Sequence, residues 1–443
     1  MKLLFIVPEY PPHSGGGIAS FYKNLLTEFV TLGHEVKVIV GSAFTSKLSS
    51  YEKDGIKVEF LDDRLADLNL DKFNRYNAIP EFQRHLAAAW TAWEQVSKGD
   101  GYDLIETTDW GMLFAPWIVS ADSPPTVVQL HGSIGQIDFY DPKLDSQLQS
   151  SLIRLLESNL LAFAEGLQTY SQSNADEWTQ LTNKAVSYIP PATPLQIINS
   201  TKKSCNGLVV ARIQYWKGVV VLCEALRLMG KHAPHIEWIG RDTRYLDSQT
   251  SISLYLSQTY PDIWNKKIQP IGTFSTEETR YLQASADFIL VPSIWDVFNF
   301  TCVEGMSQGK VVICSEGAGA SELIINEVNG LTFLPNDPQS LAKSLDNLLS
   351  LSPSKRQQLG DAAKETVSKI LDPHQIACKR IKSYEKLIKF GKSSTRPNQW
   401  LTDAVSPHKT LDKPLAFLDQ LPLSSLIEYT IDRSIKKVLR RPQ

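Results

Sequence analysis

The sequence contains no long hydrophobic run, no excess of one charge and no closely spaced pair of cysteines. No stretch approaches the roughly 20 consecutive apolar residues that a membrane-spanning helix requires. The apolar run at residues 3–7 stops at Pro8 and is shorter than the hydrophobic core of a signal peptide. We therefore expect this run to form a buried first strand, and the protein to be cytoplasmic.

Charge and cysteine content argue against further classes of function. The chain has 45 basic and 48 acidic side chains, a net charge of −3, so it lacks the overall positive field that favours nucleic-acid binding. Its five cysteines are scattered without a CxxC pair, which disfavours a zinc site or a redox motif. We expect them to be reduced thiols that pack as small hydrophobic side chains.

The first half of the chain alternates short apolar runs with segments of helical spacing. Continuous Val, Ile and Leu runs of this length are typical of parallel strands covered on both faces by helices. The expected strands are residues 3–7, 36–40, 103–106 and 126–130, and the expected helices are residues 18–32 and 80–98. Such alternation predicts a doubly wound α/β domain.

The same pattern starts again after the proline-rich break at residues 188–194. Because 443 residues exceed one ordinary hydrophobic core, we expect two domains, with a ligand cleft between the carboxyl ends of their sheets. The expected strands of the second half are residues 207–211, 236–240, 267–272, 287–292 and 310–315, with a helix at 218–230. We assign residues 1–195 to an N-terminal acceptor-side domain, 196–370 to a C-terminal nucleotide-sugar-binding domain, 371–390 to a helix returning to the first domain, and 391–443 to a linker and a basic amphipathic tail.

Two acidic residues bracket a predicted helix start in the second domain. Asp296 follows the strand at 287–292 across a short loop, and Glu304 lies about one turn into the next helix. Carboxylates accept pairs of hydrogen bonds from sugar and ribose hydroxyls, and a helix N-terminus suits a phosphate. The alternative for such a pair, taken alone, is a solvated loop and helix face.

Other strand ends carry cations, glycines and a histidine. Arg212 and Lys217 follow the first strand of the second domain, where two cations could hold a diphosphate and stabilise its growing charge. Gly16 and Gly17 belong to an SGGG loop that lets backbone approach a ligand but does not match the dinucleotide pattern GxGxxG. His131 ends the strand at 126–130, where cleft residues emerge, although a structural histidine is the alternative.

Weaker candidates stand on other loops. Some of them are as compatible with ordinary loop or packing roles as with binding. They are Glu9, Asp109 and Trp110 on the acceptor side, Gly272 and Thr273 near the base or diphosphate, Glu322 as a site residue or else a cap of local backbone, and Trp216 and Trp295 as stacking platforms.

The segment 292–337 resembles the donor-binding segment of family 4 glycosyltransferases, which carry Glu-x7-Glu at this place. Here Asp296 replaces the first glutamate, and Val297 and Asn299 stand where glycines are frequent. The resemblance extends over residues 1 to about 390 and includes the Arg and Lys-Gly of the second domain's first turn. The matching positions in segment 292–337 are Phe298, Glu304, Gly309, Asn329 and Gly330.

This resemblance implies the GT-B fold, in which two Rossmann-like doubly wound domains face each other across a cleft. It implies a retaining, metal-independent hexosyltransferase that moves a sugar from a nucleotide-diphosphate donor to a hydroxyl of a glycan, glycolipid or small molecule, as in polysaccharide biosynthesis. No cofactor besides this co-substrate is expected. By resemblance, Glu304 holds the ribose, Asp296 and His131 contact the transferred sugar, and the amides of Asn299, Phe300 and Thr301 lie near the sugar and diphosphate.

Two alternative functions and two accounts of the tail stay open. A GT-B nucleotide-sugar epimerase, or a nucleotide-sugar-binding protein without catalysis, is compatible with the same residues. The tail at 424–443 has an apolar stripe beside basic residues. We favour packing of this stripe on the protein's own surface; the alternative is an interfacial helix that contacts anionic lipid at the inner face of the membrane.

Overall fold

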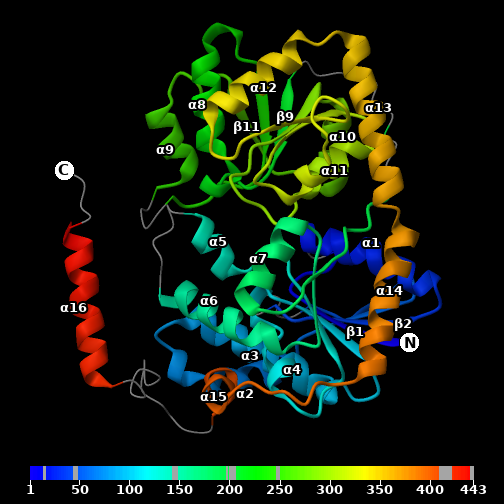
Figure 1. Cartoon of the computed structure of the whole chain (residues 1–443), viewed down its shortest axis with the longest axis vertical. Coiled ribbons are helices and arrows are strands. Elements are labelled where there is room, and N and C mark those ends of the chain that lie inside the picture. The colour runs from blue at the N-terminus through cyan, green and yellow to red at the C-terminus, as the bar shows by residue number, and fades with distance from the viewer. Residues whose placement is uncertain are drawn as a thin grey trace.

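The protein consists of two α/β domains, one above the other in the view of Figure 1. This computed structural model describes residues 1–12, 16–42, 48–141, 148–195, 198, 206–245, 250–408 and 422–439. Each domain has a parallel sheet with helices on both faces, which confirms the predicted fold class.

The N-terminal sheet has eight strands among the described residues, in the order β3-β4-β2-β1-β5-β6-β7-β8. β3 pairs antiparallel with β4, and the other neighbours pair parallel. Residues 3–7 are fully buried, as expected for a central strand with helices on both faces. The strands are β1 (Lys2–Val7), β2 (Glu35–Val40), β3 (Tyr51–Lys53), β4 (Ile56–Phe60), β5 (Leu104–Thr108), β6 (Thr126–Gln129), β7 (Gly166–Thr169) and β8 (Ser187–Tyr188).

Seven α-helices flank this sheet within the described part of the domain. Side-chain caps stabilise two of their starts, since Asp62 accepts from the Leu65 amide and Ser133 accepts from the Gln136 amide. The helices are α1 (Gly17–Thr31), α2 (Asp63–Lys72), α3 (Pro80–Gln95), α4 (Ala115–Val119), α5 (Ile134–Tyr140), α6 (Leu148–Leu160) and α7 (Gln172–Thr182).

The C-terminal sheet has six strands in the described residues, in the order β11-β10-β9-β12-β13-β14, and its neighbours pair parallel. The two predicted donor-binding segments follow central strands of this sheet: Arg212 follows β9, and Asp296 follows β12. The elements are β9 (Gly207–Val210), β10 (Ile236–Ile239), β11 (Ile268–Gly272), β12 (Phe288–Val291), β13 (Val311–Ser315), β14 (Leu331–Phe333), α8 (Val219–Met229), α9 (Ile252–Thr259), α10 (Thr276–Ser285), α11 (Phe300–Ser307), α12 (Pro338–Ser350) and α13 (Pro353–Ile370).

Helix α14 (Pro373–Phe390) runs from the C-terminal domain down the side of the N-terminal domain and lies against α1 (Figure 1). It inserts Arg380, which is fully buried, beside the N-terminal sheet. The guanidinium lies 2.7 Å from Glu106 Oε2 on β5 and donates to Gln129 Oε1 on β6 at 2.9 Å. The hydroxyl of Tyr384, one turn further along α14, donates to the same Glu106 oxygen.

The prediction that the chain continues from residue 391 as a linker is wrong for one segment. Helix α15 (Gln399–Val405) packs on α4 and α6, with Leu401 and Val405 buried. The Trp90 indole donates to the Val405 carbonyl at 2.7 Å, and Arg75 donates to the Ser406 carbonyl at 2.7 Å. An apolar pair four residues apart therefore attaches this segment to the N-terminal domain, while residues 409–414 lie outside the described residues.

Removal of the buried cation tests how much α14 depends on its ion pair. We expect Arg380→Met to lower the free energy of unfolding by about 3–5 kcal/mol, because the Glu106 carboxylate is then buried without its partner. The double variant Glu106→Gln/Arg380→Met should recover much of this loss, since no charge stays buried. Urea denaturation measures each value.

The control for this test is Lys369→Met, which removes an exposed lysine paired with Glu365 and should change stability little. A loss in the double variant as large as that in Arg380→Met would show that packing, and not the charge pair, holds α14 in place.

Candidate active site

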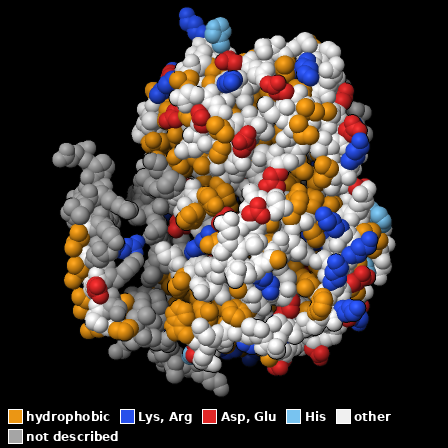
Figure 2. All heavy atoms as spheres, in the orientation of Figure 1, with side chains coloured by type: hydrophobic (Ala, Val, Ile, Leu, Met, Phe, Trp, Pro, Cys, Tyr) orange, Lys and Arg blue, Asp and Glu red, His pale blue; other side chains and the backbone are white. Residues whose placement is uncertain are grey.

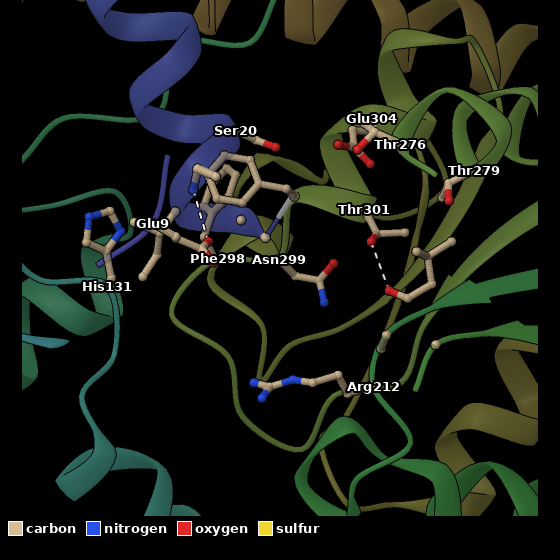
Figure 3. A pocket seen from close by; sticks show the side chains of 18 of the residues that line it. Glu9, Ser20, His131, Arg212, Thr276, Thr279, Phe298, Asn299, Thr301 and Glu304 are labelled. Atoms are coloured by element: carbon tan, nitrogen blue, oxygen red, sulfur yellow. Dashed lines mark hydrogen bonds between the residues drawn. The ribbon is translucent and has the colours of Figure 1, made fainter. Parts of the chain in front are cut away.

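A cleft of 1220 Å³ lies between the two domains, and both domains contribute to its lining. Figure 3 shows Glu9 and His131 on one side, Glu304 and Thr301 on the other, and Arg212 extending into the space between. The predicted residues that line this cleft are Glu9, Gly16, Gly17, Trp110, His131, Arg212, Trp216, Lys217, Thr273, Asp296, Asn299, Phe300, Thr301 and Glu304. Gly272 ends β11 next to this lining, where its carbonyl accepts from the Gly240 amide at 2.9 Å.

Lys217 and Asp296 form an ion pair inside the cleft. The ammonium nitrogen lies 2.5 Å from Asp296 Oδ2, and the two side chains are 13% and 16% exposed. The same nitrogen lies 3.7 Å from the centre of the Trp216 ring, which adds a cation–π contact. Burial lowers the pKa of Lys217, and the adjacent carboxylate opposes this shift. Trp216 thus supports the lysine from one side and Asp296 from the other.

Arg212 supplies a second positive charge at the cleft. Burial, followed by the charge of Arg241, lowers the pKa of its guanidinium, while Asp296 and Glu9 raise it. Arg212 therefore lies within electrostatic reach of one carboxylate from each domain. Together with Lys217 it gives the cleft two cations next to a helix start.

Helix α11 begins in the cleft at Asn299, whose φ of 80° lies in the region that favours glycine. This explains why glycine is frequent at this position in the resembling family, and asparagine is among the residues that tolerate such a φ. The side-chain nitrogen Nδ2 of Asn299 donates to Asp296 Oδ2 at 3.1 Å. No side-chain hydrogen bond caps α11, and Phe300 and Thr301 of its first turn line the cleft, so this helix start suits an anion.

Glu304 is held by a residue that sequence reasoning missed. Gln283 on α10 is fully buried and donates to Glu304 Oε2 at 2.9 Å. Burial raises the pKa of Glu304, and Gln283 and Arg280 oppose the shift. No local pattern indicates this role, because Gln283 and Glu304 lie on different helices and are 21 residues apart in the chain.

The glycine loop is occupied by the protein's own carboxylate. Glu9 Oε1 accepts from the Ala19 amide at 3.1 Å, at the N-terminus of α1 where we expected a ligand to approach. Burial raises the pKa of Glu9. A Cβ atom at Gly16 would lie 2.4 Å from Glu9 Oε1, and one at Gly17 would lie 3.1 Å from the Phe300 ring across the cleft. Gly16 therefore lets the backbone approach the Glu9 carboxylate closely, and Gly17 lets it approach Phe300 of the other domain.

His131 is hydrogen-bonded at both ring nitrogens. Nδ1 lies 2.9 Å from the Tyr170 hydroxyl, and Nε2 lies 3.3 Å from the Tyr22 hydroxyl. Burial, reinforced by the positive charge of Arg380, lowers the pKa of His131 well below its usual value, so the ring is neutral. Sequence reasoning missed both tyrosines, which look like ordinary core aromatics.

Asp109 lies beneath the cleft and does not face an acceptor, which corrects the sequence-based expectation. It is fully buried, and its carboxylate accepts from the amides of His131 at 2.9 Å and Gly132 at 3.1 Å. The Ser133 hydroxyl donates to the buried Glu157 at 2.6 Å. Asp109 and Glu157 thus fix the loop that carries His131. Of the sequence neighbours Asp109 and Trp110, only Trp110 lines the cleft.

The donor-side loop also holds the two domains together. The Trp295 ring stacks on Tyr140 at 4.6 Å with a 7° angle between the planes. A Cβ at Gly132 would lie 2.9 Å from Val297, so glycine is needed where this loop meets the first domain. Glu322 accepts from the amides of Gln172 at 2.7 Å and Ser173 at 2.8 Å. Contrary to expectation, it caps α7 of the other domain and not its own local backbone.

Two family profiles match consecutive parts of the chain. Glycosyltransferase Family 4 matches residues 15–196, and glycosyl transferases group 1 matches residues 196–366. An uncharacterized glycosyltransferase of Methanocaldococcus jannaschii is 24% identical over 389 residues, covering 79% of this chain and 89% of the relative. A glycogen synthase of Mycobacterium tuberculosis is 21% identical, covering 92% of this chain and all of the relative.

Solved structures share the fold. Sucrose-phosphate synthase from Thermosynechococcus elongatus superimposes with a TM-score of 0.70 at 16% identity, covering 88% of this chain and 99% of that one. The Anabaena protein HepE in complex with UDP superimposes with a TM-score of 0.58 at 18% identity, covering 87% of this chain and 100% of that one. The fold of both therefore extends over the described domains.

Titration of Asp109 tests its place beneath the His131 loop. Burial raises its pKa from the usual 3.8 to about 7, so the folded protein keeps a proton that the unfolded chain has lost. The contribution of Asp109 to stability is therefore largest below about pH 4 and falls as pH rises to about 7, by at most about 1.4 kcal/mol per pH unit. We expect the unfolding free energy of the wild type to decrease relative to that of Asp109→Asn across this window.

Chemical denaturation at a series of pH values measures that difference. Asp71→Asn, at an exposed position of α2, controls for the general effect of removing one acidic charge. A wild-type-to-variant difference that stays constant across the whole window would contradict the buried, proton-retaining Asp109.

Proposed function

Because this chain belongs to the family 4 glycosyltransferases and has the GT-B fold, we propose that its cleft transfers a hexose from a nucleotide-diphosphate donor to an acceptor hydroxyl, with retention of configuration and without a metal. The observation that carries the proposal is the convergence of Arg212, Lys217, Asp296 and Glu304 around the start of α11. The similarity to HepE, which is solved with UDP and with UDP-glucose, supports a nucleotide-sugar donor.

In this proposal the donor lies along the C-terminal wall of the cleft. Glu304, held by Gln283, accepts from the ribose hydroxyls. The diphosphate lies between the first amides of α11 and the two cations Arg212 and Lys217. Asp296 accepts from hydroxyls of the transferred sugar, while the neutral His131 approaches the sugar from the N-terminal domain.

The ion pair between Lys217 and Asp296 gives donor binding a defined consequence. A diphosphate carries more negative charge than one carboxylate, so it competes with Asp296 for the ammonium group. As Lys217 turns to the phosphate, Asp296 Oδ2 becomes available to a sugar hydroxyl while Asn299 keeps its hydrogen bond to the same oxygen. One rearrangement thus prepares both the leaving group and the sugar.

The transfer step breaks the bond between the anomeric carbon and the diphosphate oxygen, and this oxygen keeps the electron pair. The acceptor oxygen bonds to the anomeric carbon on the same face, and its proton passes to the departing phosphate. Arg212 and Lys217 stabilise the charge that develops on the diphosphate, which is the contribution a metal would otherwise make. Transfer should therefore persist in the presence of a chelator.

The acceptor side of the cleft comes from the N-terminal domain. Glu9 and Trp110 line it together with the glycine loop, and we propose that the acceptor is a glycan, a glycolipid or a small molecule carrying a hydroxyl. The glycogen synthases among the relatives support a role in polysaccharide biosynthesis. We place the reaction in the cytoplasm, which fits the free thiols of Cys223, Cys302 and Cys314.

Loss of the Lys217 ammonium group is the main test of this function. We expect Lys217→Ala to lower kcat by about 10²–10³-fold, since the leaving diphosphate loses a preorganised charge. Nucleotide release measured over UDP-, GDP- and ADP-sugars with a panel of acceptors gives the rates. Lys369→Ala, at an exposed position of α13, is the matched control, and thermal unfolding shows that both variants are folded.

Near-normal turnover of a folded Lys217→Ala would refute the assignment. Incubation with donor alone separates the other functions: an isomerised sugar without acceptor would indicate an epimerase. Donor binding with no nucleotide release by the wild type would indicate a binding protein.

Removal of the amide that holds Glu304 should weaken donor binding more than turnover. We expect Gln283→Leu to raise the Kd of the nucleotide sugar by roughly 5–30-fold, because one hydrogen bond to a charged group is lost. Calorimetry measures the Kd, and Gln357→Leu on the exposed face of α13 is the control. An unchanged Kd would show that Glu304 needs no support from α10.

A further inference from the structure

Helix α16 (Leu423–Leu439) carries an apolar stripe that is exposed among the described residues. Leu423, Ile427, Ile431 and Ile435 follow one another at intervals of four residues and are 71%, 51%, 54% and 52% exposed. Figure 2 shows the hydrophobic side chains of α16 on the side that points away from the body of the molecule. Our favoured expectation, that the stripe packs on the protein's own surface, is therefore wrong for Ile427, Ile431 and Ile435.

The charge of this segment is opposite to that of the whole chain. From residue 423 onward the sequence contains two acidic residues, Glu428 and Asp432, and five basic residues, while the chain as a whole has a net charge of −3. The five basic residues all follow the acidic ones and are Arg433, Lys436, Lys437, Arg440 and Arg441. An apolar stripe followed in the sequence by basic residues suits a surface that is apolar inside and anionic outside.

Neither crossing of a bilayer nor self-association explains these features as well. Within the described part of the chain, no helix has the length and hydropathy to cross a membrane. A stripe of four side chains is small beside the roughly 800 Å² per partner of a stable protein interface.

We propose that α16 lies in the plane of an anionic membrane surface, with its isoleucine stripe in the apolar boundary and its basic end at lipid phosphates. The anchor is reversible, since one helix with a few apolar side chains binds weakly and depends on charge. It connects to the N-terminal domain through α15, which is fixed by Arg75 and Trp90, so the membrane holds the acceptor-side domain. This surface is independent of the proposed transfer chemistry and does not rest on it.

Vesicle flotation of the full-length protein, without donor or acceptor, tests the proposal. We expect the wild type to float with phosphatidylcholine vesicles that contain phosphatidylglycerol, and to float much less with vesicles of phosphatidylcholine alone. Binding to the anionic vesicles should decrease as the salt concentration is raised. Ile427→Glu/Ile431→Glu should lower the bound fraction by about 10-fold or more, because charges replace the buried stripe. Lys436→Gln/Lys437→Gln should lower binding to the anionic vesicles only.

The matched control is Leu349→Glu/Ile370→Glu, which adds the same two charges at exposed apolar positions of α12 and α13 and should bind as the wild type does. Equal binding to neutral and anionic vesicles, or binding that survives the Ile427/Ile431 change, would overturn the proposal. So would a dimer, detected by light scattering without vesicles, that the same change dissociates. Transfer to a soluble acceptor should be unchanged in the α16 variants, which separates this result from a failure of the proposed function.

Discussion

The buried ion pair between Arg380 and Glu106 ties the helix that follows the second domain to the sheet of the first. Because both side chains are fully buried, separation of α14 from the N-terminal domain would leave the Glu106 carboxylate in the core without its partner. The same guanidinium lies near His131 and helps to keep its ring neutral. Arg380 of α14 thus both holds this helix on the N-terminal domain and affects the protonation of His131 in the cleft.

The cleft itself depends on charges that the protein balances internally. Lys217 pairs with Asp296, and Glu9 lies at the N-terminus of α1, so both of these positive positions have a carboxylate beside them. The loop that carries Asp296 also carries Trp295 and Val297, which contact the other domain. Asp296 therefore lies between two residues that contact the other domain.

Local sequence predicted the elements whose pattern is short-range. The apolar runs of β1 and β12, and the loop residues that follow them, identified two parallel sheets and a common cleft edge. Short strands such as β3, β8 and β14 escaped prediction because two or three residues carry no readable period. Helix α15 escaped because its apolar pair lies within a polar segment and is explained only by Trp90 and Arg75, more than 300 residues away.

The sequence by itself determined the fold class, the family and the residue types that meet at the cleft, because hydrophobic period and motif spacing are local properties. Only the tertiary structure decided what those residues contact. It showed that Gln283 holds Glu304, that Asp109 supports His131 from below, and that Glu322 caps a helix of the other domain. It also left the stripe of α16 in solvent. These contacts join positions distant in the chain, and distance along the chain conceals which polar side chains become buried together.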